Sequence, residues 1–343
     1  MTTVDSYRLS AQQRRLWADA PKERVTAKVR LAGPLDPGRL SAAVAALVAR
    51  HETLRLDIGD LTGTGLPVQV VRDDAGAEVH PAGTAPAGDA PLRVVHGPGE
   101  LVLDASVLIA DPESLRVLLT ELAACYGGAA PVEDEDRTQF LDVVEWQGEQ
   151  DRADLDADPA ALTALTLPAL ASGTAGEQPT GEYRAECPAP DGDDAAHALA
   201  AWATALGRYA DAGTLALAVH DDGRSVDGTQ GVVGPLAAPV RCEVPRTLTA
   251  EAAAGLLAGV RARSLRVTPL DHPVAAGFTH VAAAGPGPLA ALGATRVTLD
   301  APRPEAPLHL TCTRDGGTLG LALHADPAVA DPAAARLLLG AVT

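Results

Sequence analysis

The chain has 343 residues, 47% of them hydrophobic, which is typical of a globular protein large enough for two substantial cores. Its formal net charge of −18 argues against a nucleic-acid or anionic-membrane partner, because both would repel it. Aromatic residues make up only 3%, so the cores must consist mainly of alanine, valine and leucine.

Residues 1–150 predict a first α/β lobe. A long helix is expected after Leu35, and an apolar strand over Leu101–Leu103 runs into a polar turn. A second amphipathic helix then begins near Asp111, with apolar residues at helical spacing as far as Tyr126.

Residues 151–182 are rich in Asp, Ala, Gly, Pro and Thr and show little periodicity, which indicates a linker. Residues 183–343 predict a second lobe of alternating strands and helices. The expected strands are 183–187, 215–219 and 239–244, and the expected helices are 194–209 and 249–263.

The four cysteines are scattered along the chain without a C-x-x-C pair, which favours small buried hydrophobes over a metal site or disulfides. No basic and apolar leader opens the sequence, and no apolar run reaches the ~18 residues that a membrane span needs. These patterns predict a cytoplasmic protein with no membrane partner, no metal and no cofactor.

Five segments, in order along the chain, resemble the motifs of condensation domains from nonribosomal peptide synthetases. They are Tyr7–Trp17 (YRLSAQQRRLW), Leu35–Arg55 ending in RHETLR, Phe140–Gln147 (FLDVVEWQ), Val233–Arg241 (VGPLAAPVR) and the closing stretch from Phe278. The resemblance implies an α/β fold with two layers in each lobe. Two lobes similar to chloramphenicol acetyltransferase would form a pseudo-dimer in a V shape.

The family's reaction centre is the motif H-H-x-x-x-D-G, and this chain departs from it. Aligned on Asp111, the two histidines become Ser106 and Val107, and the glycine becomes Pro112. An imidazole suits a proton acceptor because its pKa lies near neutral, whereas valine carries no lone pair. No histidine lies between His96 and His197, so a shifted alignment does not restore the pair.

Asp111 is interpreted first as a structural residue. Asp and Ser at the first positions of a helix commonly cap it, and Asp111 and Ser114 fit that pattern. In the family this aspartate pairs with an arginine, and the resemblance implies Arg55 as its partner here.

Two other residues are candidates for a displaced base. Asp104 precedes the altered motif, and His220 is followed by two aspartates at the end of a predicted strand. A solvated turn is the simpler interpretation of His220, because an Asp-Gly pair follows it closely.

Three hypotheses follow. The first is a condensation-like protein that lacks peptide-bond-forming activity and serves as a binding platform for a peptidyl carrier protein, a tailoring enzyme or both. The second is an active acyltransferase that acts on carrier-tethered acyl groups with a displaced base or by positioning alone. The third is a structural spacer that keeps neighbouring modules apart.

Overall fold

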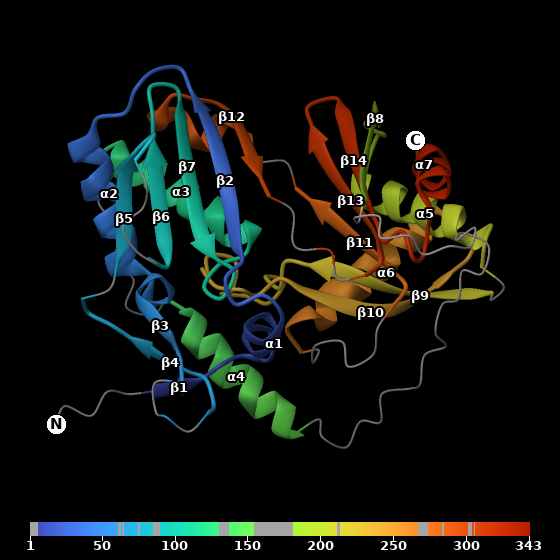
Figure 1. The fold of residues 1–343 in the computed structure, drawn as a ribbon, viewed down its shortest axis with the longest axis horizontal. Coiled ribbons are helices and arrows are strands. Elements are labelled where there is room, and N and C mark those ends of the chain that lie inside the picture. The colour runs from blue at the N-terminus through green and yellow to red at the C-terminus, as the bar shows by residue number, and fades with distance from the viewer. Residues whose placement is uncertain are drawn as a thin grey trace. The chain divides into compact units, whose positions relative to one another are not determined.

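The computed structural model describes residues 6–60, 63, 65–74, 76–84, 90–129, 137–153, 181–210, 213–266, 274–282, 285–300, 304 and 306–343 (Figure 1). Its contacts divide the chain into two compact units. Unit 1 comprises Met1–Leu155, Gly223–Ala237 and Ala284–Asp300, and unit 2 comprises Asp156–Asp222, Ala238–Ala283 and Ala301–Thr343.

This division differs from the predicted lobes, which were consecutive stretches of chain. Two segments from the second half of the sequence, Gly223–Ala237 and Ala284–Asp300, belong to unit 1. Most of the predicted linker 151–182 lies outside the described residues, so the structure does not test it.

Unit 1 is built on two sheets. Its helices are α1 (Ala11–Asp19), α2 (Pro37–Arg50), α3 (Pro112–Tyr126) and α4 (Phe140–Ala153), with the 3-10 helices η1 (Glu52–Arg55) and η3 (Gly287–Leu292). Its strands are β1 (Ser6–Arg8), β2 (Arg24–Leu31), β3 (Leu56–Gly59), β4 (Val68–Val71), β5 (Ala77–Pro81), β6 (Leu92–His96), β7 (Glu100–Ser106) and β12 (Ala294–Leu299). The strand orders are β1-β4-β3 and β12-β2-β7-β6-β5.

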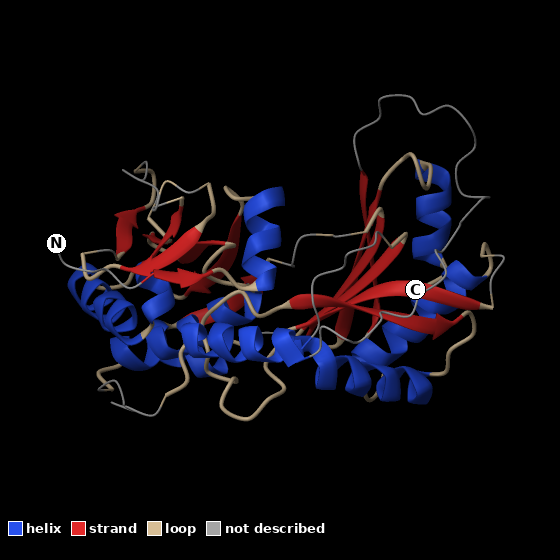
Figure 2. Ribbon diagram, turned by 90° about the horizontal axis from the view of Figure 1, so that it is seen from below, coloured by secondary structure: helices blue, strands red, loops and turns tan. Residues whose placement is uncertain are grey.

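The five-stranded sheet of unit 1 is polar on one face and apolar on the other. In β7, Leu101, Leu103 and Ala105 are fully buried, while the alternate residues are partly exposed. This period of two is the pattern of a strand with one face in the core. The apolar face packs against α2 and α3, and Figure 2 shows helices gathered on one side of this sheet. The strand predicted at Leu101–Leu103 therefore continues to Ser106.

Unit 2 is a six-stranded sheet with helices packed on it. Its helices are α5 (Asp194–Gly207), α6 (Ala250–Arg263) and α7 (Pro332–Gly340), with the 3-10 helix η2 (Ser264–Arg266). Its strands are β8 (Gly181–Pro188), β9 (Thr214–Asp221), β10 (Ala238–Pro245), β11 (Ala276–Val281), β13 (Leu308–Asp315) and β14 (Thr318–Ala325). The strand order is β10-β9-β11-β13-β14-β8, with β11 parallel to both of its neighbours.

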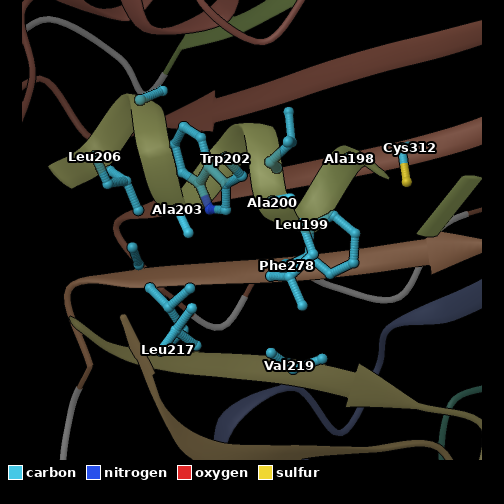
Figure 3. Packing of buried hydrophobic residues seen from close by; sticks show 14 of the residues in the cluster. Ala198, Leu199, Ala200, Trp202, Ala203, Leu206, Leu217, Val219, Phe278 and Cys312 are labelled. Carbon is cyan, nitrogen blue, oxygen red and sulfur yellow. The ribbon is translucent and has the colours of Figure 1, made fainter. Parts of the chain in front are cut away.

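The core of unit 2 is centred on Trp202 of α5, which is fully buried and lies near Phe278 and Val219 (Figure 3). The indole N–H donates to the carbonyl oxygen of Gly277 at 3.0 Å, so this large aromatic side chain leaves no unpaired polar atom. Small alanines on the same helix let it approach the sheet closely.

The predicted helices 194–209 and 249–263 correspond to α5 and α6, with ends that differ by at most two residues. The helix expected over 194–209 begins where Asp193 accepts a hydrogen bond from the Ala196 N–H, and it ends at Gly207. A side chain at Gly207 would place its Cβ 2.4 Å from the Arg246 carbonyl oxygen, so only glycine fits there. The predicted α/β class is confirmed for both units.

Candidate functional site

The N-terminus of α3 carries the altered motif. Asp111 is the N-cap, and its Oδ1 accepts hydrogen bonds from the Ser114 backbone N–H and hydroxyl, each at 2.7 Å. Pro112 occupies the first turn of the helix, where its missing N–H leaves no hydrogen bond unmade. The predicted capping role of Asp111 and Ser114 is therefore confirmed.

Asp111 also forms a buried ion pair with Arg224, which lies 113 residues further along the chain. Arg224 Nη1 is 3.0 Å from Oδ2, and Nη2 is 3.0 Å from Oδ1, a two-pronged geometry that suits a guanidinium and a carboxylate. The Arg224 side chain is 3% exposed and that of Asp111 is 7% exposed. Oδ2 additionally accepts the N–H groups of Leu236 and Ala237 at 3.0 and 2.8 Å.

The same guanidinium holds the segment 223–237 against α3. Arg224 donates to the carbonyl oxygens of Val232 and Gly234, and the Ser114 hydroxyl oxygen accepts the Gly234 N–H at 3.0 Å. The Thr53 hydroxyl donates to the Val233 carbonyl oxygen at 2.6 Å. These bonds satisfy backbone groups that would otherwise be buried without partners.

Two glycines allow this segment to come so close. Gly223 has φ of +69°, and a Cβ there would lie 2.4 Å from the Leu236 carbonyl oxygen. A Cβ at Gly234 would lie 2.2 Å from the ring of Phe140, at the start of α4. Three segments that resemble family motifs, near residues 111, 140 and 234, therefore meet in one place.

The expected partner of Asp111 was wrong. Arg55 does not reach it, and instead Arg55 Nη1 lies 3.3 Å from Oδ1 of Asp73, a fully exposed carboxylate. Arg55 is in η1, directly before strand β3, whereas Arg224 follows β9 and enters unit 1 alongside the N-terminus of α3. Sequence reasoning missed Arg224 because its pairing depends on where the chain returns to unit 1.

Ser106 and Val107 lie at a turn whose backbone N–H groups form hydrogen bonds. The N–H groups of Ser106 and Val107 donate to the carbonyl oxygens of Pro91 and Glu23 at 2.9 and 3.1 Å. The Ser106 hydroxyl accepts the Leu108 N–H at 3.3 Å. Both side chains are half-buried, while the residues that follow, from Leu108 to Asp111, are buried.

Asp104 lies near this turn and is engaged by arginines. Arg24 Nε donates to Asp104 Oδ2 at 2.8 Å, and Arg93 Nη1 lies 3.7 Å from the same oxygen. Arg24 also donates to the carbonyl oxygens of Ala90 and Asp104, which fixes its guanidinium. The Asp104 carboxylate is therefore already occupied by arginine contacts.

His220 belongs to unit 2, on the sheet face opposite the core. Its ring meets the ring of His309 edge-on, with centroids 5.5 Å apart. His309 is fully buried, and its Nε2 lies 2.8 Å from the Thr279 hydroxyl. Burial, together with a smaller effect of the nearby His324, lowers the pKa of His309 to about 4. His309 is therefore neutral at physiological pH.

Among the described residues, no group of three His, Cys, Asp or Glu side chains is placed to hold a metal ion. Cys242 and Cys312 are buried free thiols, as the sequence indicated, and burial raises the pKa of Cys242 to about 12. No helix in the described part of the chain is long and apolar enough to cross a membrane.

The geometry assigns each motif residue a structural task. Asp111 has donors on both oxygens, Ser106 accepts a hydrogen bond within its own turn, and Val107 offers only an aliphatic surface. The motif positions Ser106 and Val107 themselves carry no imidazole.

Comparison with known proteins places this geometry in context. No protein-family model matches the sequence. Over 179 residues, 44% of this chain, it is 34% identical to CymA of Salinispora arenicola, which is assigned as a nonribosomal peptide synthetase. Over 223 residues, 54% of this chain, it is 32% identical to a dimodular nonribosomal peptide synthase of Bacillus subtilis. The matches span 2% and 9% of the lengths of these two relatives.

Solved structures match nearly the whole chain. The condensation domain from the monacolin K polyketide synthase MokA aligns with a TM-score of 0.76 at 16% identity, covering 99% of this chain and 96% of that one. The X-domain from teicoplanin biosynthesis aligns with a TM-score of 0.69 at 21% identity, covering 100% and 94%. The structure of a complex of the X-domain and OxyB from teicoplanin biosynthesis also matches. It aligns with a TM-score of 0.67 at 20% identity, covering 100% of this chain and 93% of that one.

Proposed function

We propose that this chain, which has the fold of condensation domains, acts in nonribosomal peptide synthesis as a binding platform without peptide-bond-forming activity of its own. Its partners would be a peptidyl carrier protein, with the aminoacyl group on its phosphopantetheine arm, and a tailoring enzyme that acts on that group. No cofactor is needed for this role.

The observation that carries the proposal is the turn at Ser106 and Val107. The frame around the turn is complete, since the Asp111–Arg224 pair and the backbone bonds all form. At the motif positions, serine, valine and proline replace the two histidines and the glycine, and the second histidine, the family's proton acceptor, is replaced by the aliphatic Val107. Losing a general base typically lowers a rate by ~10²–10⁴, so a retained frame without the base favours binding over turnover.

The complex of the teicoplanin X-domain with OxyB supports the second partner. It shows that a protein with this fold is able to hold another protein. For this chain, the identity of the tailoring enzyme is open, and the carrier and enzyme encoded in the same gene cluster are the partners to test.

The test pairs a binding measurement with a transfer measurement. We expect calorimetry to detect a complex of the full chain with a loaded carrier domain or with the tailoring enzyme, and intact-mass analysis of loaded donor and acceptor carriers to show no transfer above the rate without protein. Transfer by the wild-type chain would contradict the proposal. Absence of any complex would instead favour the spacer hypothesis.

A matched pair of variants tests whether the missing base is the reason that the chain does not catalyse transfer. Val107→His puts an imidazole on the motif turn, whereas Val102→His puts one on the preceding strand, β7, away from the turn. If the frame lacks only a proton acceptor, Val107→His raises transfer above wild type and Val102→His does not.

A second candidate function is acyl transfer with His220 as the base. It is favoured by the position of His220 at the end of β9, where it is half-buried and beside the neutral His309. Proximity of two tethered substrates would then supply much of the rate. Transfer by the wild type that is abolished in His220→Ala and retained in Asp104→Asn would establish this function.

A further inference from the structure

Gln13 is a fully buried amide in the segment that resembles the family's opening motif. It lies in the first turn of α1. Its side-chain Oε1 accepts a hydrogen bond from the Ser10 backbone N–H at 2.9 Å, and the Gln13 backbone N–H donates to the Ser10 hydroxyl at 3.0 Å. This reciprocal pair is a capping box. Because the Ser10 N–H requires an acceptor, the amide can face only one way, with Nε2 directed to its other neighbours.

Nε2 makes two further hydrogen bonds, to residues far away in the sequence. One goes to the carbonyl oxygen of Leu108 at 3.0 Å, across 95 residues of chain, and the other to Oε1 of Gln69 at 2.9 Å. Gln69 is also fully buried, and it donates to the Arg8 carbonyl oxygen at 2.8 Å. The two amides therefore connect β1, β4, α1 and the motif turn.

Leu108 immediately follows Val107, and its carbonyl oxygen belongs to the Leu108–Ile109 peptide, one peptide unit beyond the altered position. The other bonds of the turn are local or made by main-chain groups: the Ile109 and Ala110 N–H groups donate to the Ser106 carbonyl oxygen at 3.0 and 3.1 Å, and the Leu108 N–H donates to the Ser106 hydroxyl. Gln13 contributes an anchor from a different element, and a side-chain amide can hold this carbonyl only while it keeps its N–H donors.

We propose that Gln13 is a positioning residue that, through Leu108, sets where the Ser106 and Val107 side chains stand. The inference rests on the proposed function, in which this turn contacts the aminoacyl group presented by a carrier. It assigns the opening motif a task at the motif turn besides its capping of α1.

Variants of the two glutamines separate this role from general stability. Gln13→Met is close to isosteric and removes both donors, whereas Gln13→Glu keeps an acceptor for Ser10 and removes only the N–H groups. Gln69→Met is the matched control, because it opens an equally buried amide pair and leaves the bond from Gln13 to Leu108 in place.

The first measurement is backbone hydrogen exchange over residues 106–110 in the full chain. We expect faster exchange at Ile109 and Ala110 in both Gln13 variants and exchange like the wild type in Gln69→Met. Equal exchange in Gln13→Met and the wild type would overturn the proposal, whatever the protein binds.

The second measurement is the affinity for a carrier domain loaded with a non-hydrolysable aminoacyl-pantetheine amide, compared with the same carrier unloaded. We expect Gln13→Met to raise the Kd for the loaded carrier about tenfold, the scale of one net hydrogen bond, and to leave the Kd for the unloaded carrier unchanged. An equal change for both carriers would mean a merely structural role. If the wild type does not distinguish the two carriers, the proposed function fails, while the exchange result still decides the role of Gln13.

Discussion

Replacement of Arg224 by methionine is the sharpest test of the buried network at the start of α3. Methionine keeps much of the side-chain volume and removes the charge, so Asp111 stays 6% exposed without its cation. Breaking a buried ion pair by removing one partner typically costs about 3–5 kcal/mol. Asp111 retains four donors, from Ser114 twice and from Leu236 and Ala237, which places the expected loss near the lower end, at about 3 kcal/mol.

The assay is urea unfolding followed by tryptophan fluorescence, in a double-mutant cycle with Asp111→Asn. Because the two residues are directly bonded, we expect the double variant to be more stable than the sum of the single losses predicts, by about 2 kcal/mol. Arg55→Met is the matched control. Its side chain is 20% exposed and contacts an exposed carboxylate, so it should cost less than about 1 kcal/mol and add to Asp111→Asn without coupling.

Additive losses for Asp111 and Arg224, within about 0.5 kcal/mol, would refute the reasoning. A coupling energy between Asp111 and Arg55 would refute it more directly, because it would show that Arg55, the partner implied by the family resemblance, interacts with Asp111.

Three further predictions concern single positions. His309 binds its proton only near pH 4 when folded, against an ordinary value of 6.5, so the unfolded chain binds more protons between these values and stability falls as pH drops through this window. His309→Phe should remove about 3 kcal/mol of that pH dependence, and equilibrium unfolding at pH 7 and pH 4 measures it. Gly234→Ala should destabilise the protein by about 1–3 kcal/mol in thermal unfolding, because its Cβ would lie 2.2 Å from Phe140, whereas Gly255→Ala, with nothing within 4 Å, should be neutral or stabilising. Gly277→Ala should displace the His309 ring, since its Cβ would lie 2.3 Å from Nδ1, and an unchanged imidazole pKa by NMR titration would contradict that contact.

Local sequence patterns predicted the elements of this protein because each element is determined by its neighbours in the chain. Asp111 and Ser114 were identified as a cap from their spacing, and the structure shows both of the expected hydrogen bonds. Helix α5 begins at the predicted residue, Asp194, and ends at Gly207, two residues before the predicted end.

The candidate site was predicted in part. The sequence located the motif turn and showed that its proton acceptor is absent, since both follow from residue identity. Asp104 was named as a possible base, but no sequence pattern indicated that Arg24, 80 residues away, binds its carboxylate. The role of Gln13 at the turn was equally hidden, because its bond to Leu108 spans 95 residues.

Composition and periodicity by themselves determined an α/β chain with alternating elements and capped helices, and the resemblance to the family identified Val107 as the aliphatic residue at the motif position. Only the tertiary structure decided which arginine neutralises Asp111, because that depends on segment 223–237 returning to unit 1 from the second half of the chain. A cap is satisfied within three residues, whereas a buried charge is satisfied by whatever the fold brings beside it.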